Sequence, residues 1–171
     1  MTLRVFSVLM VLLLALMSFN QCSRPPAPGT GSAELDQPAP PFILANLDER
    51  EISLDQYRGK IVMLDFWATW CGPCRMTMPI LEKLQKEYRD DLILLAINIQ
   101  ETPDLVRPYV RKQNIKSMVL LDQKGSVSAA YGSNSIPMNV LIDRQGIIRH
   151  VQVGYGANME AQLRAEINKL L

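Results

Sequence analysis

The chain has 171 residues, of which 48% are hydrophobic and 20% charged, and its formal net charge is +1. These values are ordinary for a globular protein, and the length suffices for one domain with a good core once the N-terminal segment is set aside. The near-neutral charge gives no electrostatic reason to expect a nucleic-acid partner, and three cysteines are too few for a disulfide-stapled scaffold.

The chain opens with a targeting pattern. Arg4 precedes an almost unbroken apolar run over residues 5–19, as in a secretory signal, although a signal-anchor is also compatible with this length. Cys22 follows in a loose match to a lipoprotein cleavage box, with Gln21 where such boxes favour a small residue. We expect residues 1–22 to be a signal peptide or membrane anchor. Lipidation of Cys22, an uncleaved anchor and simple cleavage all stay open, and each places the domain outside the cytoplasm.

Residues 23–38 have the composition of a flexible tether. Residues 23–38 are rich in Pro, Gly, Ala and Ser, a composition that buries too little apolar surface to order itself. We therefore expect a flexible, Pro-rich tether here, followed by a single folded domain over residues 39–171.

The folded part alternates strand-like and helix-like patterns. Residues 42–44 and 51–54 predict a small hairpin, and residues 61–67 and 92–99 predict strands buried on both faces. Strands separated by helices indicate parallel pairing with right-handed crossovers, so we expect an α/β fold with a central mixed sheet flanked by helices. The other expected elements are helices 75–88, 104–113, 127–131 and 159–171, strand 118–121, and a closing hairpin of 140–143 and 147–153.

The most informative motif is Trp70-Cys71-Gly72-Pro73-Cys74, which lies between an expected strand and an expected helix. If the helix begins at Cys71, unpaired N–H groups and the helix dipole lower its thiol pKa and make it the exposed nucleophile, with Cys74 the more buried resolving thiol. Gly72 permits close approach of a partner chain, and Pro73 fits an early helical position. The motif predicts dithiol–disulfide exchange.

Zinc binding is the main alternative for the two thiols. A zinc site needs four ligands, but the chain has no second CxxC and a single His150, far along the sequence. We therefore expect neither a metal nor a cofactor.

Asp65 is the second candidate site residue, since a carboxylate within a buried apolar strand is unfavourable without a partner or a task. Burial raises such a pKa and lets the group accept a proton from Cys74. The alternative is an Asp at a strand edge, solvated or paired with Lys60.

Ile136-Pro137 precedes the strand predicted at 140–143. A cis proline beside the thiols would offer backbone groups to an extended peptide. Taken alone, Pro137 favours an ordinary trans loop proline, because cis is the minority state.

These residues resemble the thioredoxin superfamily and, within it, the membrane-tethered TlpA/ResA-like thiol–disulfide oxidoreductases. The resemblance covers about residues 39–171 and implies a thioredoxin fold. It implies Cys71 as nucleophile, Cys74 as resolving thiol and Pro137 as the cis proline. It also strengthens the expectation that Asp65 handles a proton, because this position matches the buried Asp of cytosolic thioredoxins. The matching residues are Gly59-Lys60, 65–74, Pro79, Ile136-Pro137, 140–143 and 39–42.

Two departures from the family pattern stand out. Many members carry Glu three residues after the second cysteine, where this chain has Thr77, so we expect Asp65 to take over the proton handling. Thr-Thr usually follows the cis proline, but here Met138-Asn139 does.

We expect an extracytoplasmic oxidoreductase that reduces protein disulfides, for example in cytochrome c maturation, and that an upstream membrane thiol reductant recycles. We expect it to be monomeric and to bind partners through Trp70, Gly72, Pro73, Ile136 and Pro137. The alternatives are a redoxin-type thiol peroxidase, a disulfide oxidase or isomerase, and a non-enzymatic lipoprotein with a structural disulfide.

Overall fold

The computed structural model describes residues 33–171. The expected signal or anchor, including Cys22, lies outside these residues. Within the described part, no helix combines the length and apolar character needed to cross a bilayer.

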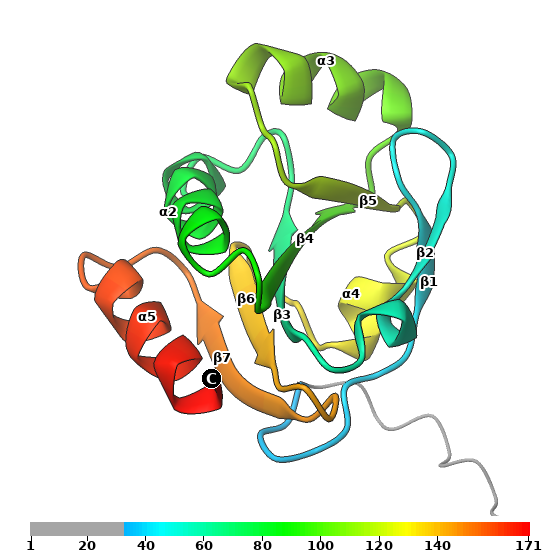
Figure 1. The fold of residues 1–171 in the computed structure, drawn as a ribbon. Coiled ribbons are helices and arrows are strands. Elements are labelled where there is room, and N and C mark those ends of the chain that lie inside the picture. Colours follow the sequence, from blue (N-terminus) through cyan, green and yellow to red (C-terminus); the bar gives the residue numbers. More distant parts are fainter. Residues whose placement is uncertain (1–32) are drawn as a thin grey trace, which may run out of the picture.

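A five-stranded mixed sheet forms the centre of the domain (Figure 1). Its order is β5-β4-β3-β6-β7, with β3 parallel to β4, β4 parallel to β5, and β6 antiparallel to both β3 and β7. The long apolar runs at 61–67 and 92–99 become the two inner parallel strands, as strands covered on both faces should. The strands are β3 (Ile61–Trp67), β4 (Leu92–Ile99), β5 (Met118–Asp122), β6 (Met138–Ile142) and β7 (Ile148–Val153).

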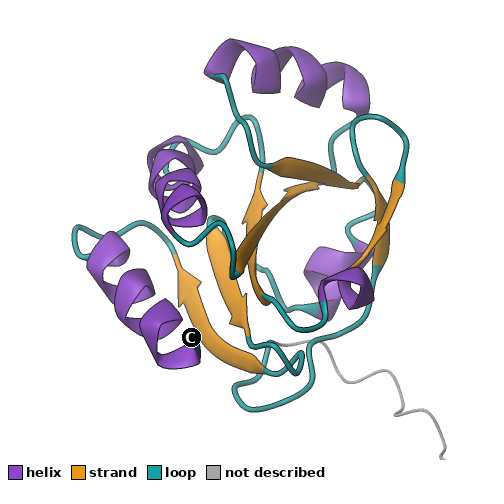
Figure 2. Cartoon of the chain, viewed as in Figure 1, coloured by secondary structure: helices purple, strands orange, loops and turns teal. Residues whose placement is uncertain are grey.

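Helices cover both faces of the sheet (Figure 2). Alternate residues of β3 point to opposite faces. Val62, Leu64 and Phe66 join a core that includes residues of α4 and of the N-terminal hairpin, whereas Ile61 and Met63 pack with residues of α2 and α5. The helices are α2 (Cys74–Glu87), α3 (Pro103–Gln113), α4 (Ser126–Ala130) and α5 (Met159–Leu170).

The N-terminal β-hairpin is confirmed. Strands β1 (Ile43–Ala45) and β2 (Glu51–Ser53) pair antiparallel, and Asn46 bridges to Leu120 of β5. A single turn of 3-10 helix, η1 (Leu54–Tyr57), follows β2 and was not expected. The mixed sheet with flanking helices and this hairpin is the fold that the sequence predicts.

Residues 33–38, which we expected to belong to the tether, contact the domain. The N–H of Ala33 donates to the Tyr131 carbonyl, and the N–H of Asp36 donates to the Ile148 carbonyl. The Asp36 carboxylate also pairs with Arg149 at 2.6 Å. The ordered contacts of the domain thus begin upstream of residue 39.

Candidate active site

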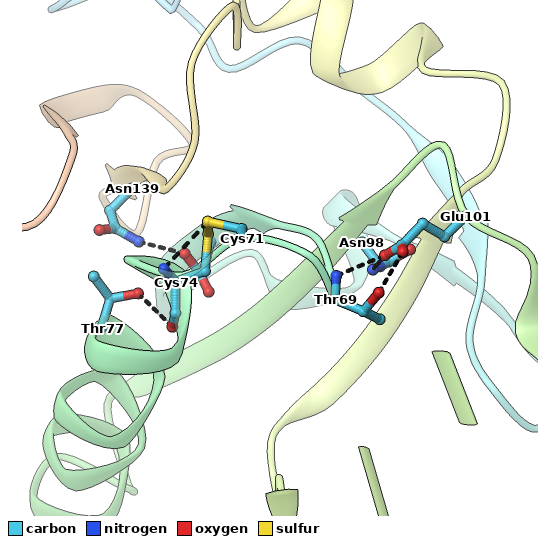
Figure 3. The surroundings of a disulfide bond; sticks show 8 residues. Thr69, Cys71, Cys74, Thr77, Asn98, Glu101 and Asn139 are labelled. Carbon is cyan, nitrogen blue, oxygen red and sulfur yellow. Dashed lines mark hydrogen bonds between the residues drawn. A yellow bond between two sulfur atoms is a disulfide. The ribbon is translucent and has the colours of Figure 1, made fainter. Parts of the chain in front are cut away.

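The two cysteines lie where β3 gives way to α2, and the structure joins them in a disulfide (Figure 3). The N–H of Cys74 donates to the Cys71 sulfur at 3.2 Å. A backbone N–H aimed at this sulfur stabilises a thiolate relative to a thiol once the bond is reduced. Cys71 therefore has the local environment of an activated nucleophile.

One detail of the expected motif geometry is wrong, and one condition set for it is not met. Helix α2 begins at Cys74, one residue before the expected start at residue 75, and not at Cys71, because residues 72–73 form a turn whose carbonyls accept from Arg75 and Met76. Cys71 is also not the more exposed thiol, since both cysteines are 3% exposed. The exposed group at the site is the neighbouring Trp70, which is 70% exposed.

Asp65 lies in the middle of β3 and is fully buried. Its Oδ1 accepts a hydrogen bond from the Asn139 amide at 2.8 Å. Lys60, the alternative partner, instead donates to the Asp90 carbonyl. Burial raises the pKa of Asp65 to about 7, and the Asn139 hydrogen bond works against that rise. Asp65 is thus a carboxyl that exchanges protons near neutral pH.

Strand alternation places Asp65 on the same sheet face as Trp67. Trp67 packs in one apolar cluster with Cys71 and Cys74. No hydrogen bond joins the Asp65 carboxyl to either sulfur within residues 33–171. The structure therefore places the carboxyl on the sheet face that also carries Trp67 and the thiol cluster, without a hydrogen bond to either sulfur in the disulfide form.

Thr77 stands at the position where the resemblance would place a glutamate. Its side chain is completely buried, and its hydroxyl donates to the Cys74 carbonyl at 3.1 Å. A threonine hydroxyl does not titrate in the physiological range, so this position cannot handle protons as a carboxylate does.

The Ile136-Pro137 peptide bond is cis. Ile136 packs against the cluster that contains both cysteines, so the loop lies beside the thiols. The Pro137 carbonyl accepts a hydrogen bond from the N–H of Gly154 at 2.7 Å. The Pro137 carbonyl is thus already engaged within the domain.

Glu101 is a site residue that the sequence reading missed. It is nearly buried, and its carboxylate accepts from the N–H of Thr69 at 2.8 Å, the Thr69 hydroxyl at 2.5 Å and the Asn98 amide at 2.7 Å (Figure 3). These bonds tie the segment leading to the CxxC motif to the end of β4. A usable signal was that Asn98 and Glu101 stand at the carboxyl end of a parallel strand, the edge where sites gather in open α/β sheets.

We expect Glu101→Ala to lower the free energy of unfolding by about 2–3 kcal/mol, because one buried donor on Asn98 and two part-buried donors on Thr69 lose a charged acceptor. Denaturant unfolding of the oxidised protein measures this effect. Glu101→Gln retains one acceptor oxygen and should lose less. A loss below about 0.5 kcal/mol in the alanine variant would show that the carboxylate does not stabilise the loop.

A small cleft of about 60 Å³ lies between α2 and α3, next to Cys74. Its lining includes Trp67, Met78 and Tyr109, and the rings of Trp67 and Tyr109 lie 5.6 Å apart. The sequence reading did not include Tyr109, because its place beside Trp67 depends on how α3 packs. Nowhere in residues 33–171 do three potential metal-ligating side chains (His, Cys, Asp or Glu) gather as a metal site requires.

Known proteins are similar to this chain in sequence and fold. The AhpC/TSA family model matches residues 35–151. Thioredoxin-like protein YneN of Bacillus subtilis is 37% identical over 77% of this chain and 79% of its own length. Thiol-disulfide oxidoreductase ResA of Geobacillus thermodenitrificans is 33% identical over 86% of this chain and 85% of its own.

Among solved structures, a protein of Chlorobium tepidum described as a candidate thiol:disulfide interchange protein DsbE superposes with a TM-score of 0.77. It is 28% identical, and the match covers 81% of this chain and 99% of that one. The chain belongs to the AhpC/TSA family, has the thioredoxin fold, and is a thiol–disulfide oxidoreductase.

Proposed function

We propose that the protein reduces protein disulfides outside the cytoplasm, with Cys71 as nucleophile, Cys74 as resolving thiol and Asp65 as proton acceptor. The observation that carries this proposal is the Cys71 sulfur, which receives the Cys74 N–H at the start of α2, beside the exposed Trp70. That geometry favours the thiolate at Cys71, and the thiolate is the attacking species in disulfide exchange.

The reaction has two steps. The Cys71 thiolate attacks a substrate disulfide, forms a mixed disulfide and releases one substrate thiolate, which takes a proton from solvent. Cys74 then gives its proton to Asp65 and attacks the Cys71 sulfur, which forms the Cys71–Cys74 bond and releases the second substrate thiolate. Two electrons pass from the protein thiols to the substrate, so an upstream thiol reductant must supply two electrons for the next cycle.

The substrate surface of this proposal consists of Trp70, Gly72, Pro73, Ile136 and Pro137. Trp70 offers exposed apolar area next to Cys71, and Gly72 has no side chain to obstruct an approaching peptide. An extended segment lying along Ile136 would place its own sulfur over Cys71, as in strand addition.

Location and partners rest on the N-terminal sequence and on the resemblance. An apolar run, Cys22 and a Pro-rich segment support a tether that holds the domain near a membrane surface, facing the periplasm or cell exterior. The Gly-Pro dipeptide between the cysteines resembles that of reducing thioredoxins, which supports the reducing direction. Apocytochrome c, whose haem attachment needs reduced cysteines, is the substrate that we propose, with the protein acting as a monomer.

The experiment is a trap with Cys74→Ser in the full chain, expressed in its own membrane context. Without a resolving thiol, Cys71 should remain in mixed disulfides with its substrates, which mass spectrometry identifies after affinity capture. The matched control, Cys71→Ser, should capture none. Capture of haem-binding CxxCH proteins supports the proposed substrate. Equal capture by both variants would remove Cys71 as the nucleophile.

The peroxidase alternative predicts a different result. A peroxidatic Cys71 would let Cys74→Ser consume hydrogen peroxide stoichiometrically, whereas the proposed function predicts consumption no faster than by an ordinary exposed thiol. Residues 65–70 lack the Pro-x-x-x-Thr/Ser-x-x-Cys setting of such enzymes, which supports exchange chemistry instead.

A further inference from the structure

Asn139 is the direct cross-strand neighbour of Asp65. The register of β3 against β6 pairs the two residues, which are 74 positions apart in the sequence. They are 1% and 0% exposed. Directly opposed side chains of an antiparallel pair have their Cβ atoms about 4.5–5.5 Å apart and share one face of the sheet. Asn139 is therefore placed to act on the carboxyl.

The two oxygens of the Asp65 carboxyl have different surroundings. The Asn139 Nδ2 donates to Oδ1 at 2.8 Å, a bond drawn as a dashed line in Figure 3. Oδ2 is buried and has no hydrogen-bond partner in the described part of the chain. A carboxylate only accepts, so its charge fixes which end of the amide faces it.

We propose that Asn139 is a positioning residue: its amide holds Oδ1 of Asp65 and thereby leaves Oδ2 to receive the Cys74 proton. The inference rests on the proposed role of Asp65 in resolving the mixed disulfide. The proton leaves the Cys74 sulfur for Oδ2, the Cys74 thiolate forms the bond to Cys71, and the substrate thiolate departs. Asp65 then returns its proton to solvent before the next cycle.

An amide suits both protonation states of the carboxyl. It donates to the carboxylate, and after protonation its own oxygen, which is unpaired within residues 33–171, is available to accept. The hydrogen bond from the Asn139 amide favours the charged form of the Asp65 carboxyl. It therefore keeps the pKa of Asp65 lower than burial alone would. Asn139 thus limits how far burial reduces the fraction of Asp65 that is ionised and able to accept a proton.

Within residues 33–171, no charged side chain hydrogen-bonds or pairs with Asp65. Its neighbour on β4 is Ala96. Beyond Asn139, β7 contributes Gln152 opposite it and the titratable His150 two residues away, opposite Leu141. Charged side chains of α2 and α5 pair with one another at the surface, as Lys83–Glu160 and Arg164–Glu87. Asn139 is therefore the side chain whose hydrogen bond adjusts the pKa of the Asp65 carboxyl.

Asn139→Val and Asn139→Thr form a matched pair, since the two side chains have nearly the same shape and only threonine can donate. The readout is the rate at which a mixed disulfide of Cys71 with a small thiol resolves, measured by stopped flow from pH 5 to 10. Asn139→Val should raise the midpoint of this profile by about one pH unit and slow the rate at pH 7 about fivefold. Asn139→Thr should keep the midpoint nearer that of the unmodified protein.

Tyr131→Phe is the structural control. It removes a part-buried hydrogen bond to the Pro40 carbonyl, at the core on the opposite face of the sheet, and should leave the midpoint unchanged. If Asn139→Val shares the unmodified protein's midpoint, Asn139 does not position the carboxyl. If instead no mixed disulfide of Cys71 forms in any variant, it is the proposed function that fails.

A measurement on the unmodified protein covers the case in which the valine variant does not fold. The side-chain amide resonances of Asn139 should titrate with the same midpoint as the Asp65 carboxyl carbon, which NMR detects. An Asn139 amide that shows no change through the Asp65 midpoint would overturn the inference.

Discussion

Replacing Cys71 by serine should lower the rate of protein-disulfide reduction by a factor on the order of 10³ or more. The exchange begins with a thiolate, and a serine hydroxyl has no comparable ionised form near neutral pH. The Cys74 N–H that stabilises the Cys71 sulfur has nothing equivalent to act on in the variant. The assay is reduction of a model protein disulfide by the prereduced domain, followed by the appearance of substrate thiols.

Cys22 provides a comparison for this experiment, since it is the third cysteine of the chain and lies outside the CxxC motif. Cys22→Ser in the full chain should leave the rate unchanged. A Cys71→Ser rate within tenfold of the unmodified protein would show that another thiol attacks.

Asp65→Asn should make the oxidised protein more stable at pH 8 by as much as roughly 4 kcal/mol, with no such gain at pH 3. The pKa of Asp65 rises from 3.8 to about 7 on folding, because burial disfavours the charged form. About three units of pKa correspond to roughly 4 kcal/mol. Below pH 3.8 the group is protonated in both states, so it leaves the stability unchanged.

The direction in which stability changes with pH follows from the raised pKa of Asp65. Between pH 4 and 7 the unfolded chain loses the Asp65 proton while the folded chain keeps it, so stability falls as pH rises and the loss is complete above pH 7. Asparagine keeps an oxygen to accept the Asn139 amide and has no charge to bury. Urea unfolding at several pH values measures the difference between the two proteins.

Thr77→Val is the matched control, because it removes a buried polar group on α2 that does not titrate. Its change in stability should be about 1 kcal/mol and the same at every pH. A pH-independent effect of Asp65→Asn would mean that the carboxyl stays charged in the folded protein, and Asp65 would lose its role as a proton acceptor near neutral pH.

The strands and helices that carry the site follow from local patterns. The uninterrupted apolar runs predicted β3 and β4, and helical spacing predicted α2 to within one residue at each end. The position of Cys71 relative to the helix was harder to predict. The chain enters α2 through a turn at residues 72–73, and Cys71 lies just outside the helix. Hydrogen bonding at the turn, rather than residue pattern, decides that boundary.

The contacts between distant segments could not be predicted in the same way. Asn139 stood out in the sequence only as a departure, because its pairing with Asp65 depends on the register between β3 and β6. Glu101 looks like any surface carboxylate until β4 brings it against Thr69. Asp65, by contrast, was visible from the sequence because a charge inside an apolar strand is rare.

The reduction potential of the Cys71–Cys74 pair tests the account most directly. Equilibration of the domain with a dithiol buffer of known potential gives this value, and alkylation counts the free thiols. A disulfide reductase predicts a potential near thioredoxin's, about −270 mV. A value near −120 mV, that of a strong disulfide oxidant, would contradict the proposed direction, and a pair that does not equilibrate with the buffer would contradict the exchange itself.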